Sequence, residues 1–188
     1  MQLTSQQALP ATPQQAWDAL NDIDLLKQSI PGCETITATS DTSYEVLVAA
    51  AIGPVKARFK SKLQLLDVVP PQSYTMQFDG QGGPAGFGKG TAKVRLEPAP
   101  DGTTVLHYDV NAQVGGKIAQ VGSRLVDMAA QKIASDFFNN FTRVITEKYP
   151  PAPVAPTAEA APAPAPAAAP SGFFARLWAA LRRLFGLG

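Results

Sequence analysis

The sequence has one cysteine and one histidine in 188 residues, and these shortages exclude several kinds of site. Cys33 alone cannot form an internal disulfide bond, which fits a reducing compartment. One cysteine and one histidine cannot supply the ligands of a zinc site. Nucleophilic catalysis needs a base set against a nucleophile, and no second imidazole exists beside His107. The sequence therefore gives little support to an enzyme.

Excess charge and long apolar runs are also missing. Sixteen Lys and Arg residues stand against 15 Asp and Glu residues, so no nucleic-acid-binding footprint is visible. No apolar run reaches the roughly 18–20 residues that cross a bilayer. The N-terminal MQLTSQQALP has neither the basic nor the apolar region of a signal peptide. We therefore expect a cytoplasmic protein with a single sizeable core.

The residues that are present predict an α+β domain over 1–149. Thr12-Pro13-Gln14-Gln15 combines an N-cap, a first-turn proline and a capping-box glutamine, and a second short helix follows near Ile23–Leu26. From Glu34 onward apolar and polar residues alternate, which predicts antiparallel strands with one buried face. With the strand at Leu3–Leu9, the sheet has about seven strands.

A long helical pattern follows Gly115 and Gly116 and continues to about Lys148, just before two prolines. At 100° per residue, its predicted buried face carries mostly apolar and small residues: Val121, Gly122, Leu125, Met128, Ala129 and Ile133. A rod of this length is most simply buried by a curved sheet wrapped around it. The small residues in its middle leave room between helix and sheet.

Three separated stretches resemble the carbon monoxide dehydrogenase G-subunit family: IPGC, GPVKARFKSKLQL, and GFGKGTAKVRL followed by VGGKIAQVGSRLVDMAAQKIASDFFNNF. The resemblance covers roughly residues 1–148 and implies the helix-grip fold of START and Bet v 1-like proteins. It also implies a non-catalytic protein without a cofactor of its own, which serves a molybdenum hydroxylase of the carbon monoxide dehydrogenase type. By the same resemblance, such proteins recruit that enzyme to the inner membrane surface or handle quinone there.

Within this fold the inward apolar residues indicate a lipophilic site, and a quinone is the ligand that the resemblance implies. The expected ligand-binding residues are Phe59, Leu63, Met76, Phe78, Phe87, Tyr108, Val110, Val121, Leu125 and Met128. Tyr108 is the expected hydrogen-bond donor to a ligand carbonyl. The same residues would form an ordinary core if the protein were a purely structural membrane adaptor. A polyketide-cyclase-like enzyme on the same fold is a further alternative.

Two surface patterns leave alternatives open. Six glycines over 80–90 indicate either a tight turn in a curved sheet or a pliable gate at the mouth of a cavity. Cations that alternate along two strands predict seven positive charges on the outer sheet face: Lys56, Arg58, Lys60, Lys62, Lys89, Lys93 and Arg95. They would form either a solvated face or a docking site for an acidic partner or anionic headgroups.

Residues 150–170 are mostly proline and alanine, which predicts an extended spacer. Residues 171–188 predict an amphipathic helix too short to span, lying in the membrane interface. Its expected membrane-binding residues are Phe173, Phe174, Arg176, Leu177, Trp178, Leu181, Arg182, Arg183, Leu184 and Phe185. The alternative is docking on a partner protein or a second copy. The expected location is peripheral, on the inner face of the cell membrane.

Overall fold

The computed structural model describes residues 1–150. The predicted tail helix, and the predicted linker apart from Pro150, lie outside the described residues. The elements in chain order are β1 (Gln2–Leu9), α1 (Pro13–Leu20), α2 (Ile23–Ser29), β2 (Cys33–Ser40), β3 (Ser43–Ile52), β4 (Val55–Val69), β5 (Ser73–Gln81), the 3₁₀ turn η1 (Gly83–Ala85), β6 (Phe87–Pro98), β7 (Thr104–Gly115), α3 (Lys117–Gln120) and α4 (Ser123–Lys148).

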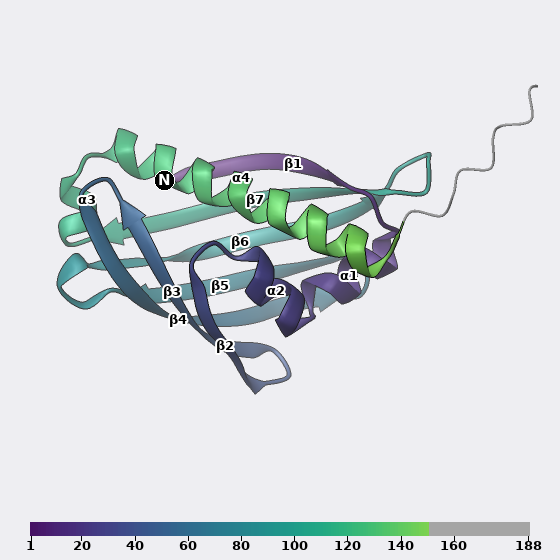
Figure 1. The fold of residues 1–188 in the computed structure, drawn as a ribbon, viewed down its shortest axis with the longest axis horizontal. Helices are drawn as coiled ribbons and strands as arrows, with labels where there is room; N and C mark the ends of the chain where they lie inside the picture. The colour runs from purple at the N-terminus through teal and green to yellow at the C-terminus, as the bar shows by residue number, and fades with distance from the viewer. Residues whose placement is uncertain (151–188) are drawn as a thin grey trace, which may run out of the picture. The chain divides into compact units, whose positions relative to one another are not determined.

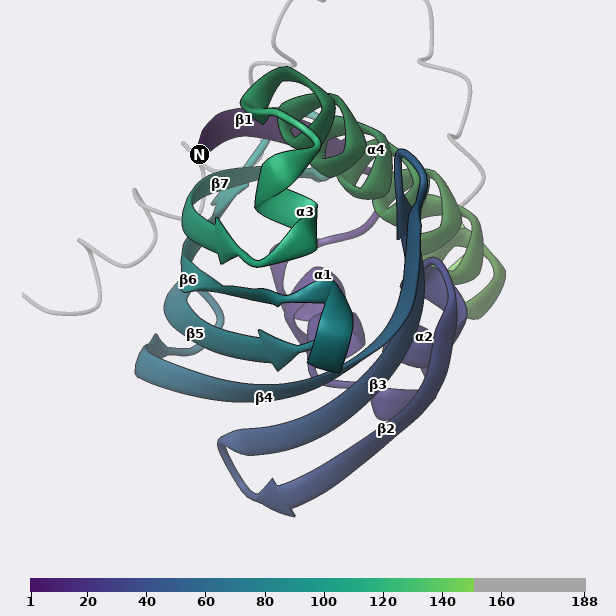
Figure 2. The same cartoon turned by 90° about the vertical axis from the view of Figure 1, so that its left-hand side faces the viewer.

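The seven strands form one antiparallel sheet in the order β1-β7-β6-β5-β4-β3-β2. Sequential strands are neighbours, except that β1 pairs with β7. The sheet bends around the long helix α4, and α1 and α2 lie at one end of the arch (Figures 1 and 2). This confirms the predicted helix-grip fold.

The two short helices begin at the caps that their sequences supply. The Thr12 hydroxyl accepts a hydrogen bond from the Gln15 backbone at 3.3 Å, and the Gln15 side chain accepts one from the Thr12 backbone at 3.0 Å. This is the predicted capping box. The Asp22 carboxylate caps α2 and also receives the Lys148 ammonium at 2.6 Å. That ion pair fastens the end of α4 to α2.

The packed core gathers at one end of the arch. The second half of α4 contributes Phe141 and Ile145, both 0% exposed, and α1 contributes Trp17. The core also includes Leu96 and Leu106 on the inward faces of β6 and β7. Fixing this end positions the remainder of the sheet, because β1, β6 and β7 contribute to the core and pair with the strands beside them.

The long helix differs from its prediction in continuity and in phase. It is interrupted at Val121–Gly122, where Gly122 has a φ of +96°, so α3 and α4 are separate helices. The interruption resets the phase, and Val126 becomes the buried residue of the first turns of α4 at 5% exposed. Much of the predicted buried face is exposed instead: Leu125 by 44%, Met128 by 57% and Ile133 by 41%.

Candidate ligand site

Away from the packed core, the inward face of the sheet is not covered completely. Its residues alternate as predicted, and cross-strand pairs such as Leu63–Phe78 and Ala92–Val110 place them on the side of the sheet that carries α4. Several large inward side chains are only half-buried there: Phe59, Leu63, Met76, Phe78 and Val110, while Tyr108 packs against the edge of the core. A close-packed interior would bury such side chains almost fully. The arch is therefore packed at one end and open at the other.

A pocket of about 440 Å³ lies at the open end. Its walls are the β3–β4 turn, α3 and the start of α4, which meet at the end of the arch that faces the viewer in Figure 2. The lining is mainly apolar, with two polar residues: Pro54, Val55, Val121 and Leu125, with Lys117 and Gln120. Two of the expected ligand-binding residues, Val121 and Leu125, therefore line a pocket at the mouth of the arch.

Two other expected residues lie elsewhere. Met128 is exposed on the outside of α4 rather than directed at the sheet. The Phe87 ring faces away from α4, because Phe87 precedes the inward Gly88 and its ring lies against Gly115. The Lys89 ammonium lies 5.8 Å from the centroid of that ring. Placing Phe87 at the ligand site was wrong, because the strand alternation turns it outward.

Three tyrosines stand on the inward face. Tyr108 stacks on Phe138 with centroids 5.1 Å apart, and Tyr74 meets Trp17 edge-on at 5.8 Å. Tyr74 and Tyr108 lie in one cross-strand row, on either side of Val94. Tyr44 on β3 lies opposite Leu63 on β4. Burial, with a smaller contribution from Tyr44, raises the pKa of the Tyr74 phenol, so it remains a neutral hydrogen-bond donor.

Sequence reasoning selected only Tyr108 as a polar anchor. The strand alternation also turns Tyr44 and Tyr74 inward, but their proximity depends on strand pairing, which the sequence does not state. The pairing of β5 with β6 and of β6 with β7 is what places Tyr74 two strands from Tyr108.

The glycine-rich segment between β5 and β6 is closely packed against its surroundings. A Cβ on Gly82 would lie 2.4 Å from the Phe59 ring, and one on Gly80 would lie 2.7 Å from the Ser61 hydroxyl. The Gly82 backbone donates a hydrogen bond to the Gly86 carbonyl at 2.7 Å, which closes the turn. Close approach accounts for these glycines, so the packing interpretation is favoured over a gate.

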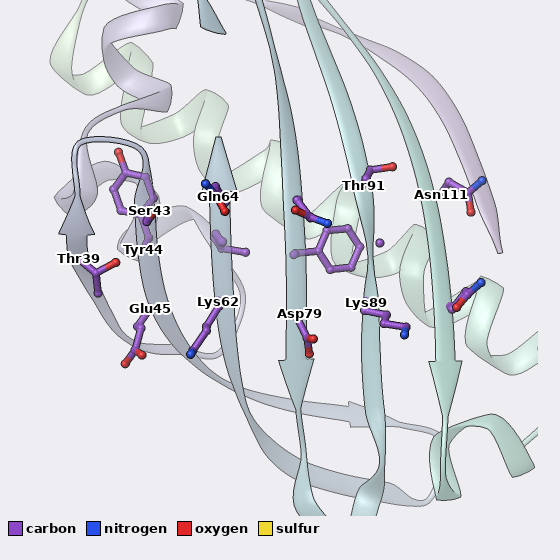
Figure 3. A pocket seen from close by; sticks show the side chains of 15 residues that line it. Thr39, Ser43, Tyr44, Glu45, Lys62, Gln64, Asp79, Lys89, Thr91 and Asn111 are labelled. Atoms are coloured by element: carbon purple, nitrogen blue, oxygen red, sulfur yellow. The ribbon is translucent and has the colours of Figure 1, made fainter. Parts of the chain in front are cut away.

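A second hollow, of about 840 Å³, is of a different kind and spans the outer face of the sheet (Figure 3). Two cross-strand rows of polar side chains line it. One row runs Ser43, Gln64, Gln77, Thr91 and Asn111, and the other runs Glu45, Lys62, Asp79, Lys89 and Gln113. Tyr44, Leu63 and Phe78 lie between these rows, but the charged and amide side chains on either side do not suit a lipophilic ligand, so we assign the ligand site to the inward face.

The seven outer cations lie where the sequence placed them, but acids stand among them. Arg58 pairs with Glu34 at 2.8 Å, Lys60 pairs with Glu45 at 3.1 Å, and Arg95 pairs with Glu97. Asp109 is directly opposite Lys93 across β6 and β7. The acids come from β2, β3, β6 and β7, and a solvated face is the better interpretation for these paired cations.

The family of this chain follows from its match to a family model. The model of the carbon monoxide dehydrogenase G subunit (CoxG) matches residues 6–146, which is most of the described chain. The chain belongs to the CoxG family. No curated protein matches the chain in sequence.

Solved structures agree with the fold of this CoxG-family chain. A conserved protein from Geobacillus kaustophilus is 29% identical with a TM-score of 0.74, covering 79% of this chain and 97% of its own. A START superfamily protein from Mycobacterium smegmatis is 12% identical with a TM-score of 0.61, covering 78% and 98%. An aromatase/cyclase from Streptomyces sp. R1128 is 12% identical with a TM-score of 0.56, covering 79% and 94%.

Neither of the two rare residues is placed for catalysis in this CoxG domain. His107 lies on the outer face, where its Nε2 is 2.8 Å from Glu97 Oε2. Cys33 is half-buried, and burial raises the pKa of its thiol, which disfavours the reactive thiolate. Within residues 1–150 no cluster of three or more His, Cys, Asp or Glu residues could hold a metal ion. No helix among these residues is long and apolar enough to cross a membrane.

Proposed function

We propose that this protein binds a lipophilic small molecule, a quinone, in the open half of the arch, and does so without chemistry of its own. The observation that carries the proposal is the half-burial of large apolar side chains that face α4, among them Leu63, Met76 and Phe78. Each still has accessible apolar surface on the face of the sheet that carries α4. An apolar ligand in contact with them would bury that surface and gain about 25 cal/mol for each Å².

The polar groups of the arch support a quinone rather than a fatty acid. A quinone has an apolar ring and two carbonyl oxygens that only accept hydrogen bonds. The inward tyrosines Tyr44, Tyr74 and Tyr108 offer hydroxyl donors, and none of the described inward strand residues from Tyr44 to Val110 is a Lys, Arg or His that would pair a carboxylate.

Membership of the CoxG family supports a partner, a molybdenum hydroxylase of the carbon monoxide dehydrogenase type. Such an oxidase needs an electron acceptor, and a quinone from the bilayer would serve. The domain then carries quinone between the cytoplasmic face of the membrane and the enzyme, and residues 171–188 hold the chain to the bilayer. Phe174 and Trp178 belong to the expected apolar side of that segment.

Mass spectrometry of extracted lipids tests the ligand. The purified full-length protein is incubated with quinone-containing vesicles, separated from them by size and extracted with organic solvent. We expect about one quinone for each chain. A protein that leaves the vesicles without quinone or any other lipophilic molecule would point to a structural adaptor, and chemical turnover of the molecule would point to a cyclase-like enzyme.

Vesicle flotation tests the membrane segment independently. The full-length protein should float with anionic vesicles, whereas protein ending at Pro170 should remain at the bottom, and so should protein carrying Phe174→Glu with Trp178→Glu. Failure of the full-length protein to float without its partner enzyme would contradict the membrane role of residues 171–188. The ligand experiment would be unaffected.

A further inference from the structure

The first turns of α4 leave large apolar side chains in water. Leu125 is 44% exposed, Met128 57% and Ile133 41%, and at 100° per residue the three fall within an arc of about 140° on one side of the helix. Single exposed apolar residues are ordinary, but a contiguous group marks an interaction surface. Leu125 also lines the 440 Å³ pocket, so the group continues into the apolar walls of the mouth at Pro54, Val55 and Val121.

The charges around this group are mostly positive. Lys56 follows the β3–β4 turn, Lys117 begins α3, and Arg124 lies in the first turn of α4. Within residues 1–150 none of these three side chains forms an ion pair, in contrast to Arg58, Lys60 and Arg95, which are paired on the outer face. The one acid in the same turns is Asp127.

We infer that this mouth surface docks on an anionic lipid bilayer. It consists of Pro54, Val55, Val121, Leu125, Met128 and Ile133, with Lys56, Lys117 and Arg124 beside them. Exposed apolar side chains flanked by unpaired cations match an interface in which acyl chains lie beneath negative headgroups. The domain therefore has a lipid contact of its own, which orients it on the bilayer but is too weak to hold it there without residues 171–188.

The position of the pocket indicates how the bilayer contact would serve ligand transfer, and this step rests on the proposed function. The pocket opens within the mouth surface, beside Val121 and Leu125. When this surface lies on the bilayer, a lipophilic molecule passes between acyl chains and arch without crossing water. Docking elsewhere on the domain would leave a layer of water between the two.

A fluorescent label reports the contact directly. In the full-length protein with Cys33→Ser, Met128→Cys is coupled to a polarity-sensitive nitrobenzoxadiazole dye. The control label is at Val69→Cys, since Val69 is also an exposed apolar residue, at 48%, but lies at the opposite end of β4. The probe membranes are vesicles of equal parts phosphatidylcholine and phosphatidylglycerol, with pure phosphatidylcholine for comparison.

We expect the dye at position 128 to shift to the blue and brighten on the anionic vesicles, while the dye at position 69 changes little. Lys117→Glu with Arg124→Glu should weaken the response at position 128 on the order of ten-fold. An unchanged emission at position 128 on protein that floats would overturn the mouth surface and leave the tail intact. A response at position 128 without flotation would support the mouth surface and count against the tail.

Discussion

Leu63 and Leu106 are both leucines on the inward face of the sheet, but their surroundings differ. Leu106 is 2% exposed within the packed core, whereas Leu63 is half-buried in the open half. Leu106→Trp should therefore overpack the core and cost about 1–3 kcal/mol of unfolding free energy. Leu63→Trp should leave stability nearly unchanged and lower quinone binding, because the indole fills the space that the ligand would use.

Denaturant unfolding and quinone titration of both variants check this contrast. Because both variants carry the same substitution on the same face, the pair distinguishes a loss of quinone binding from a loss of folding stability. A stability loss at Leu63→Trp as large as that at Leu106→Trp would show that the open half is a dense core.

Residue-level prediction from the sequence succeeds where it depends on alternation alone. The inward phase of β4 and β5 is confirmed because a strand turns every second side chain to the same face. The prediction for Phe87 is wrong because the strand alternation turns its ring outward, beside the inward Gly88. The acids Glu34 and Glu45 were missed as partners of Arg58 and Lys60 because cross-strand pairing is not visible along a single strand.

At the scale of elements, α4 has two halves with different roles. The second half carries Phe141, which is 0% exposed, and the first half carries Met128, which is 57% exposed. Phe141→Ala should cost about 3–5 kcal/mol, because it leaves a cavity in the core. Met128→Ala should change stability by less than about 0.5 kcal/mol.

Thermal or denaturant unfolding measures both substitutions. Equal losses would mean that the first half of α4 also packs against the rest of the protein. This division could not be predicted from the sequence, because a helical phase counted from Ile118 holds only while the helix is uninterrupted. Gly122, with its φ of +96°, ends that continuity.

The connection between α2 and α4 should make stability depend on pH. The Lys148 ammonium, together with backbone N–H groups of α2, holds the pKa of Asp22 below its ordinary value of 3.8. Because the folded-state pKa is the lower one, the stabilisation is fully present above the unfolded value and is lost as pH falls through the folded value. The window is therefore acidic, from about pH 4 downward.

Asp22→Asn tests the charge while an amide oxygen still caps α2. We expect this variant to lose less stability than the wild type as pH falls from neutral into that window, measured as the melting temperature. Asp22→Ala, which also removes the cap, should cost about 1 kcal/mol more at neutral pH. If Asp22→Asn and the wild type lost stability in parallel on acidification, the ion pair with Lys148 would contribute nothing measurable.

On the scale of the whole molecule, the domain is divided along its length. One end is closed by α1, α2 and the aromatic half of α4, and the other opens beside α3 and the β3–β4 turn. Stability is concentrated at the first end, and the proposed ligand and membrane contacts lie at the second. The sequence could predict the architecture, because strand and helix periods are local. It could not predict which end is packed, because that depends on where α1 and α2 settle.

The proposed quinone in the open half of the arch is tested most directly by photolabelling. The full-length protein is irradiated with an azidoquinone, and its peptides are analysed by mass spectrometry. We predict adducts on the peptides that carry Leu63, Phe78 and Val110, and their loss when unlabelled quinone competes or when Leu63 is replaced by Trp. Adducts confined to the outer face, or labelling that excess quinone does not reduce, would contradict the account.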